Sequence, residues 1–138
     1  SSDLITYRID KYESKEISKS EGGVAIGLPL VILTDGGTAS ASEVVTGALK
    51  DYNAAVTVGT TTFGKGVVQL PFELKSGIGG LKVTVSKYYT PKGEDINKKG
   101  IIPDYEVKLT EEDVNKDYSK DTDPQLQKGI EVIKDMIK

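Results

Sequence analysis

A serine and a lysine, each close to glycine residues, are the side chains of this sequence that could do chemistry together. Ser40 follows the run 35–39 (Asp-Gly-Gly-Thr-Ala), and Lys65 lies between Gly64 and Gly66. A serine hydroxyl is a weak nucleophile at neutral pH and needs a neighbouring base. Histidine most often supplies such a base, but this chain contains no histidine. If Ser40 is a nucleophile, lysine is therefore the base that the composition favours, with Lys65 as the candidate.

The surroundings of Lys65 leave two interpretations open. A lysine acts as a base only in its neutral form, which burial among apolar groups favours, and Phe63, Val67 and Val68 could supply that burial. Gln69 could orient the amine, or it could be a solvent-facing glutamine of a strand. Lys65 could equally be a surface charge. A phosphate-binding loop is not indicated, because the spaced glycines that precede Gly-Lys-[Ser/Thr] in such loops are missing.

The segment around the serine also has two interpretations. Ser40 and Glu43 have the spacing of a capping box, in which the serine only starts a helix. However, the apolar run 28–34 comes directly before this turn, and strand, sharp turn and helix is the context of a nucleophile elbow. The amides at a helix N-terminus have no partner within the helix, so the N–H of Ala41 is the candidate donor to an oxyanion.

The elements around these residues predict an α/β fold. The continuous apolar run 28–34 is typical of a strand buried on both faces in a parallel sheet. Residues 41–51 have helical spacing, and 54–59 is a second short apolar strand. Strand, helix and strand form a βαβ unit, and active groups in such sheets lie at the carboxyl ends of the strands. Ser40 is at that place in the sequence.

The remaining segments predict strands and one further helix. Apolar and polar residues alternate in 68–74 and again in 81–85, with a glycine-rich loop between them, which predicts a β-hairpin. Residues 4–10 have strand composition, and the polar stretch 11–23 contains a second extended piece. A last strand, 101–107, contains Pro103, which favours the edge of a sheet. A final helix is expected with Asp123 as its cap and Pro124 at its first position.

Composition excludes several classes of function. The net charge of −3 and the pI near 5.1 give no electrostatic footprint for nucleic acid. Without cysteine there are no disulfides, thiol nucleophiles or cysteine zinc sites, and the lack of histidine removes most other transition-metal sites. We find no apolar run long enough for a membrane span and no signal peptide. Because the chain starts Ser-Ser-Asp with no initiator Met, we expect a piece of a longer protein.

Several runs together resemble the carboxyl-terminal processing protease family, the tail-specific serine–lysine peptidases of the S41 type. In order, they are 29–33 (Pro-Leu-Val-Ile-Leu), 37–43 (Gly-Thr-Ala-Ser-Ala-Ser-Glu), 58–69 (Val-Gly-Thr-Thr-Thr-Phe-Gly-Lys-Gly-Val-Val-Gln), 88–93 (Tyr-Tyr-Thr-Pro-Lys-Gly), 100–104 (Gly-Ile-Ile-Pro-Asp) and the helix start 123–126 (Asp-Pro-Gln-Leu). They occur in family order and at family spacing. The resemblance implies a ClpP/crotonase-like core fragment with a βαβ unit, a β-hairpin and a C-terminal helix.

Residue by residue, the resemblance places the family's nucleophile on Ser40, its lysine base on Lys65 and its lysine-orienting glutamine on Gln69. Asp51 matches an acidic position that the family often has after the catalytic helix, and we interpret it as supporting structure. Thr38 stands where serine is more usual, which leaves the nucleophile unchanged. No cofactor or metal is implied.

The departure from the family pattern lies upstream. Family members carry a peptide-binding PDZ domain and, before this region, a strand that ends in an Asn-x-Gly-Gly type loop resembling the source of a second oxyanion donor; neither is found in this sequence. We therefore expect 1–109 to be the C-terminal part of the protease core, 110–122 a charged linker and 123–138 a C-terminal helix. Such a chain alone is expected to be inactive or weakly active.

The resemblance implies a serine endopeptidase that cleaves polypeptides near their C-termini through an acyl-enzyme. Its partners would be polypeptide C-termini and the PDZ domain of the parent protein, with homo-oligomer formation left open. The family usually works in the bacterial periplasm or on the outer face of the cytoplasmic membrane. Two alternatives stay open: a non-catalytic peptide-binding or scaffold module of the same fold, and a crotonase-like acyl-CoA enzyme, in which Lys65 and Gln69 would have no task.

Overall fold

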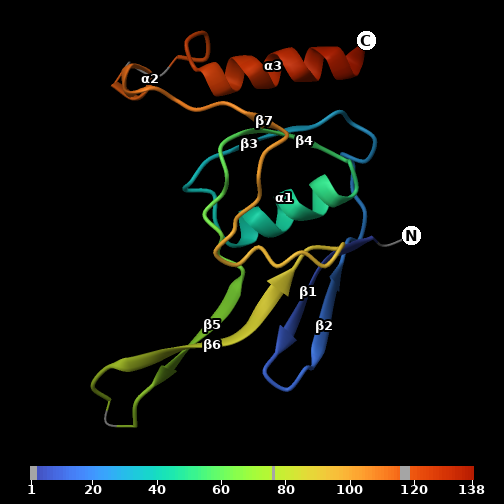
Figure 1. Cartoon of the computed structure of the whole chain (residues 1–138). Coiled ribbons are helices and arrows are strands. Elements are labelled where there is room, and N and C mark those ends of the chain that lie inside the picture. The colour runs from blue at the N-terminus through green and yellow to red at the C-terminus, as the bar shows by residue number, and fades with distance from the viewer. Residues whose placement is uncertain (1–2, 76, 116–118) are drawn as a thin grey trace.

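Two β-sheets organise the chain, with helices on both sides of the smaller sheet (Figure 1). The structure is a computed structural model that describes residues 3–75, 77–115 and 119–138. In chain order the elements are β1 (Leu4–Asp10), β2 (Lys15–Lys19), β3 (Val31–Thr34), α1 (Ala41–Asp51), β4 (Val56–Gly59), β5 (Val67–Glu73), β6 (Gly80–Tyr89), β7 (Tyr105–Glu106), α2 (Glu111–Asn115) and α3 (Pro124–Ile137). Positions 1–2, 76 and 116–118, which include parts of the expected hairpin loop and linker, lie outside the described residues.

The predicted βαβ unit is confirmed. β3 and β4 pair in parallel, with Val31 opposite Val56 and Thr34 opposite Gly59, and α1 connects them. β7 adds to the far side of β4, so the three-stranded sheet has the order β3-β4-β7. The last strand therefore lies at an edge, as Pro103 predicted, but it is limited to Tyr105–Glu106 rather than extending over 101–107.

Helix α1 buries mainly small and polar residues rather than its largest apolar ones. Its buried residues are Glu43, Thr46, Gly47 and Ala48, whereas Val45 is 52% exposed. A Cβ on Gly47 would meet the Cγ2 atom of Thr90 at 2.9 Å, so the close packing of α1 on the segment after β6 depends on this glycine. The helix lies between the three-stranded sheet and β1, which makes it the centre of the molecule (Figure 1).

Helix α3 covers the opposite face of the three-stranded sheet. It begins as predicted, because the Asp123 side chain accepts hydrogen bonds from the amides of Gln125 and Leu126 and Pro124 opens the helix. Gly129 faces β3, where an added Cβ would lie 3.1 Å from Leu33. The expectation of a β3 strand buried on both faces is wrong, since Leu33 is 42% exposed. In the described part of the chain β3 lies at the edge of this sheet and is less covered than the central strand β4, whose last three residues are all buried.

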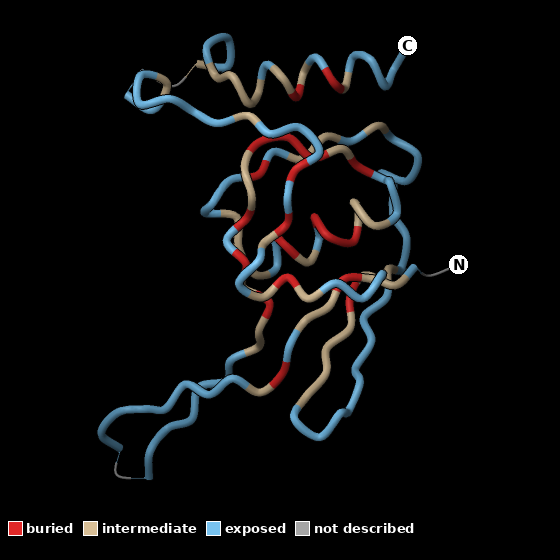
Figure 2. The backbone as a smooth tube through the Cα atoms, viewed as in Figure 1, coloured by how far each residue is buried: buried red, intermediate tan, exposed pale blue. Residues whose placement is uncertain are grey.

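The four-stranded sheet has the order β2-β1-β6-β5 and extends away from the helices (Figure 1). The predicted β5–β6 hairpin is antiparallel, with Leu70 opposite Val83 and Phe72 opposite Leu81. The ends of the two hairpins that point away from α1 are exposed, and the buried residues concentrate around α1 and the segments beside it (Figure 2). The segment with Lys65 lies between this compact part and the hairpin, directly before β5.

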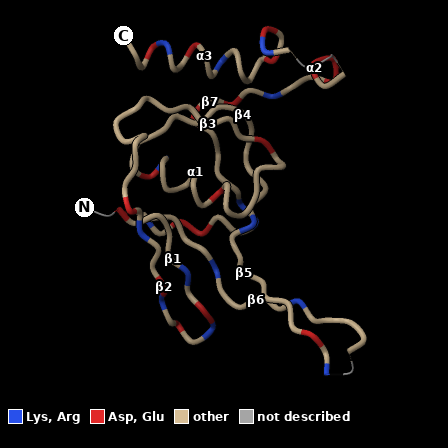
Figure 3. Tube along the Cα trace, turned by 180° about the vertical axis from the view of Figure 1, so that it is seen from behind, with Lys and Arg blue, Asp and Glu red and all other residues tan. Residues whose placement is uncertain are grey.

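Charges of both signs are spread over the surface of the described chain. The β1–β2 hairpin and α3 each carry basic and acidic side chains close together (Figure 3). Among the described residues, we find no helix with the length and apolar character that crossing a membrane requires.

Candidate active site

Ser40 lies in a tight turn between β3 and α1. Asp35 holds this turn, because its Oδ1 atom accepts hydrogen bonds from the amides of Gly37 and Thr38, both at 2.9 Å. Ser40 is the residue immediately before the helix and has φ 60° and ψ −118°. This backbone conformation resembles the first central position of a type II′ turn, which glycine dominates. A serine there is strained by about 1–3 kcal/mol, and strained residues concentrate at functional sites.

The strain at Ser40 predicts an unusual stability order. Ser40→Gly should be more stable than Ser40→Ala by about 1 kcal/mol, because both lack the hydroxyl and only glycine relieves the backbone. Ser42, two residues later and inside α1, provides the matched control. There, Ser42→Gly should be less stable than Ser42→Ala by about 1 kcal/mol. Thermal unfolding of the four variants measures both differences; the same order at the two positions would show that Ser40 is not strained.

The buried carboxylate of Glu43 connects the serine turn with the lysine loop. Glu43 has no exposed surface. Its Oε2 atom accepts hydrogen bonds from the backbone N–H of Ser40 at 2.9 Å and of Lys65 at 2.8 Å. Its Oε1 atom accepts from the Thr62 hydroxyl at 2.5 Å and from the Gly64 N–H at 2.7 Å. A single oxygen atom therefore fixes the backbone of both candidate catalytic residues.

The serine turn and the lysine loop also meet at their backbones. The Phe63 N–H donates to the carbonyl oxygen of Thr38 at 2.9 Å, and the hydroxyl of Thr38 donates to Asp35. Lys65 itself is half-buried. Phe63 is 66% exposed, so the apolar cover that the sequence suggested for Lys65 is not provided by this ring. The structure thus brings Ser40 and Lys65 together through their backbones, while a Ser40–Lys65 dyad of side chains stays a prediction.

The two glycines beside Lys65 are required by close packing. Gly64 has φ 86°, and a Cβ on it would lie 2.9 Å from the backbone nitrogen of Gly100. A Cβ on Gly66 would lie 2.7 Å from the backbone nitrogen of Asn97. The turn that contains Asn97 and Gly100 is therefore packed in close contact with the lysine loop. A Gly-Lys-Gly run that looked like weak evidence in the sequence is a tightly packed loop in the structure.

Gln69 and Ala41 occupy the expected elements, but their roles stay predictions. Gln69 is exposed on β5, and its Nε2 atom donates to the hydroxyl of Thr84 at 3.3 Å. Its amide is thus directed to the neighbouring strand in this conformation. Ala41 is the first residue of α1 and is exposed, so its N–H belongs to the helix end at which amides lack intrahelical partners.

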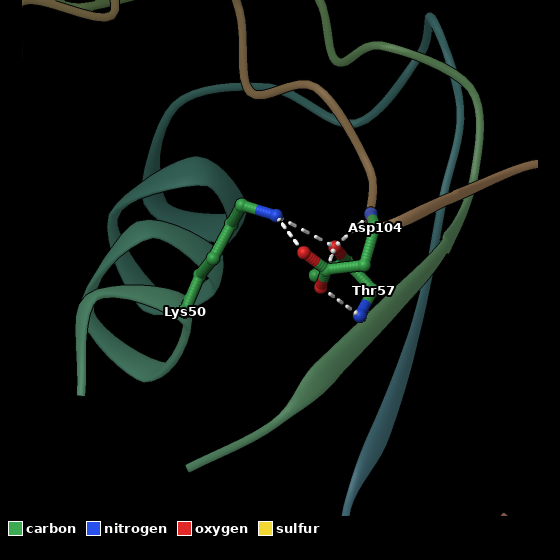
Figure 4. A network of polar contacts seen from close by, with 3 residues as sticks. All are labelled: Lys50, Thr57 and Asp104. Carbon is green, nitrogen blue, oxygen red and sulfur yellow. Dashed lines mark hydrogen bonds and ion pairs between the residues drawn. The ribbon is translucent and has the colours of Figure 1, made fainter. Parts of the chain in front are cut away.

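A second polar network anchors the other end of α1 (Figure 4). Asp104 forms an ion pair with Lys50 through Oδ1. Its Oδ2 atom accepts hydrogen bonds from the amide and the hydroxyl of Thr57, at 2.8 and 2.7 Å. Partial burial raises the pKa of Asp104, but the hydrogen bonds from Lys50 and Thr57 outweigh burial and leave this pKa below its usual value. The carboxylate form is therefore favoured in the folded protein.

Asp51 also ties α1 to the segment after β6, since its Oδ2 atom accepts the Lys92 N–H at 2.8 Å. A hollow of about 1200 Å³ opens beside this end of the helix, lined in part by Lys50, Asp51, Lys92 and Asp104. Ser40 and Lys65 are not among its lining residues. This hollow is therefore separate from the candidate site, and the Asp51 contact fits the structural role interpreted from the sequence.

Sequence reasoning missed the roles of two carboxylates that each hold several donors, Glu43 and Asp104. Glu43 was recognised only as the local partner of a capping box, and Asp104 only as part of a matching run. The signal for Glu43 was its position three residues into a helix that packs between two sheets. A carboxylate that is buried at such a place needs several hydrogen-bond donors. No local pattern marked Asp104, because its partners Lys50 and Thr57 lie far from it in the sequence.

Comparison with known proteins identifies what the chain is similar to. The family model described as peptidase family S41 matches residues 1–107. A carboxyl-terminal-processing protease of Synechocystis sp. is 48% identical over 100 residues, which cover 72% of this chain and 23% of that protein. A carboxyl-terminal-processing protease of Picosynechococcus sp. is 41% identical over 131 residues, covering 95% of this chain and 31% of that protein.

Solved structures agree with these relatives. A structure described as the photosystem II D1 C-terminal processing protease has a TM-score of 0.72 and 41% identity, covering 78% of this chain and 28% of that chain. An S41 protease structure from Bacteroides fragilis has a TM-score of 0.73 at 20% identity, over 96% of this chain and 37% of that chain, which supports the fold alone. The chain thus spans less than a third of the length of the two cyanobacterial relatives.

Proposed function

This chain belongs to peptidase family S41, and we propose on that premise that it carries the nucleophile and base of a serine endopeptidase that cleaves polypeptides near their C-termini. The observation that carries the proposal is the Glu43 carboxylate, which holds the backbones of Ser40 and Lys65 on one oxygen atom. Two loops distant in sequence are thereby fixed beside one another. The strained backbone of Ser40 also favours a catalytic role over a scaffold role, because such strain concentrates at functional sites.

The proposed mechanism uses Ser40 as the nucleophile and Lys65 as the base. Neutral Lys65 takes the hydroxyl proton as the Ser40 oxygen attacks the scissile carbonyl carbon, and the N–H of Ala41 stabilises the oxyanion. Lys65 then gives the proton to the leaving amine, the C–N bond breaks and an acyl-enzyme remains. Lys65 next takes a proton from water, the hydroxide attacks the ester, and the proton returns to Ser40. None of these steps requires a metal or a nucleotide.

Gln69 is proposed to orient Lys65 during these steps. Its side chain would have to rotate away from Thr84, to which its amide donates in the described conformation. Gln69 is exposed on an edge strand, so solvent can replace this contact at little cost. The orientation would then form when substrate covers the site.

The rest of the site is proposed to come from other parts of the protein. A second oxyanion donor from an upstream loop would complete the hole, since loss of one donor costs about 10²–10³ in rate. A PDZ domain would bind the polypeptide C-terminus, and formation of a homo-oligomer is compatible with this arrangement. By its family resemblance, we place the parent protein outside the cytoplasm, in the periplasm or on the outer face of the cytoplasmic membrane.

A serine-directed phosphonate probe tests this function against the scaffold alternative. In the complete protein, the probe should attach to Ser40, as located by mass spectrometry of the labelled peptide, and peptide hydrolysis should be measurable. Ser42 is a matched control, because it is an exposed serine two residues away. Ser42→Ala should keep the label and Ser40→Ala should lose it. A protein that binds peptides without hydrolysis and without label would be a scaffold module.

A further inference from the structure

Residues 100–104, here called the strap, match a family motif that the catalytic proposal leaves without a role. The strap begins at Gly100, the last residue of the turn that packs against the lysine loop, and leads into β7. Ile101 and Pro103 are buried, whereas Ile102 is 71% exposed. The segment therefore packs into the protein with alternate residues, and its backbone connects two distant sets of contacts.

The first end of the strap is bonded to Thr62, three residues before Lys65. The Ile101 N–H donates to the Thr62 hydroxyl oxygen at 2.8 Å, and the Thr62 N–H donates to the Ile101 carbonyl at 3.2 Å. The contact is close, since a Cβ on Gly100 would lie 2.2 Å from the Thr62 carbonyl oxygen. Gly100 has φ 70°, a conformation that glycine adopts without strain.

The Thr62 hydroxyl links the strap to the candidate site, because it bonds both Ile101 and Glu43. Its hydroxyl accepts from Ile101 and donates to Glu43, so the direction of the hydroxyl proton is fixed by the strap. Glu43 in turn holds the backbones of Ser40 and Lys65. A shift of Ile101 therefore moves the donor that orients the carboxylate between the two candidate catalytic residues.

The second end of the strap is fixed by Asp104 (Figure 4). Its side chain binds Lys50, in the last turn of α1, and Thr57 in β4. The Asp104 N–H also donates to the Thr57 hydroxyl at 2.9 Å. An asparagine cannot replace this carboxylate, because its NH₂ group would face either the Lys50 ammonium or the Thr57 amide. Only a carboxylate satisfies all three donors.

We propose that the strap is a positioning element of the peptidase site, with Asp104 as the positioning residue that holds Ile101 against Thr62 and thereby keeps Glu43 between Ser40 and Lys65. This inference rests on the proposed function. The side-chain partners of Asp104 are Lys50 and Thr57, so in this proposal Asp104 acts on Ser40 and Lys65 through the backbone of 101–104. Because α1 carries both Glu43 and Lys50, the strap ties the lysine loop to the two ends of the same helix.

Kinetics of the complete protein carrying Asp104→Asn test the proposal. We expect kcat to fall by about tenfold to hundredfold, as for a small displacement of a reacting group, with KM within about twofold of the unchanged protein. The rate of phosphonate labelling of Ser40 should fall by the same factor. Asp123→Ala is the control for lost stability, since this aspartate accepts two backbone amides on one oxygen at the start of α3. It should lower Tm and leave kcat unchanged.

A double-mutant cycle distinguishes positioning from general destabilisation. Thr62→Val should lower kcat in the same way and Thr62→Ser should restore it, because serine keeps the bridging hydroxyl. Asp104→Asn should then have little further effect in the Thr62→Val background, since the path through Thr62 is already broken. Two outcomes would overturn the proposal. One is a double variant whose kcat falls by the product of the two single reductions, and the other is an Asp104→Asn protein with a lower Tm and an unchanged kcat. An unmodified protein that neither hydrolyses peptides nor takes the label would instead refute the proposed function.

Discussion

Replacing Lys65 by alanine in the complete protein is expected to lower kcat for peptide hydrolysis by at least about 10²–10⁴-fold. That range is the contribution that a positioned general base usually makes. Ser40→Ala should reduce hydrolysis to background, because no acyl-enzyme can form without the hydroxyl. The double variant should be no worse than Ser40→Ala alone, since residues that act as one unit are not additive. Steady-state kinetics on a peptide substrate measures all three.

Lys65→Arg makes this experiment sharper. Arginine keeps the positive charge and the approximate length, but a guanidinium is not deprotonated in proteins and cannot act as a base. If Lys65 is a base, Lys65→Arg should be as inactive as Lys65→Ala. Lys99→Ala is the control, because Lys99 is an exposed lysine on the neighbouring turn. An active Lys65→Arg would show that only the charge matters, and an active Lys65→Ala would rule out the dyad.

The order of the elements could be predicted because local patterns determine it. A continuous apolar run followed by a glycine turn and helical spacing predicts β3 and α1, and alternation predicts the β5–β6 hairpin. The start of α3 could be placed to the residue, since Asp123 and Pro124 cap the helix through local hydrogen bonds. The position of Ser40 at the start of α1 has the same origin. These features depend on residues within a few positions of one another.

The contacts that assemble the site could not be predicted, because they depend on residues far apart in the chain. The capping box placed the Glu43 side chain near the Ser40 amide, but its other three donors come from 62–65. The burial of α1 shows the same limit: Thr46 and Gly47 are buried and Val45 is not, because packing on the segment after β6 selects small residues. Hydrophobicity alone ranks these residues in the opposite order.

Glu43→Gln should have the largest effect on the fold and the site together. Each carboxylate oxygen of Glu43 accepts two hydrogen bonds, from Ser40 and Lys65 on one side and from Thr62 and Gly64 on the other. A glutamine has one oxygen, so its NH₂ group faces either the two amides of Ser40 and Lys65 or the Gly64 amide and the Thr62 hydroxyl, of which only the hydroxyl can accept from it. One or two hydrogen bonds to a buried charged group are therefore lost, each worth about 1.5–3 kcal/mol. We expect a loss of stability of about 1.5 kcal/mol or more.

The same substitution should lower kcat by about 10²-fold or more, because either orientation of the glutamine displaces part of the site. Its NH₂ group faces the amides of Ser40 and Lys65 in one orientation and the Thr62–Gly64 side of the lysine loop in the other. Stability is measured by denaturant unfolding, and kcat at a temperature at which the folded fraction of Glu43→Gln is verified. Glu131→Gln, an exposed glutamate on α3, is the control and should change neither quantity. A Glu43→Gln protein that is folded and fully active would mean that the shared oxygen is not needed to hold Ser40 and Lys65. A folded but inactive variant would separate the positioning role of Glu43 from its contribution to stability.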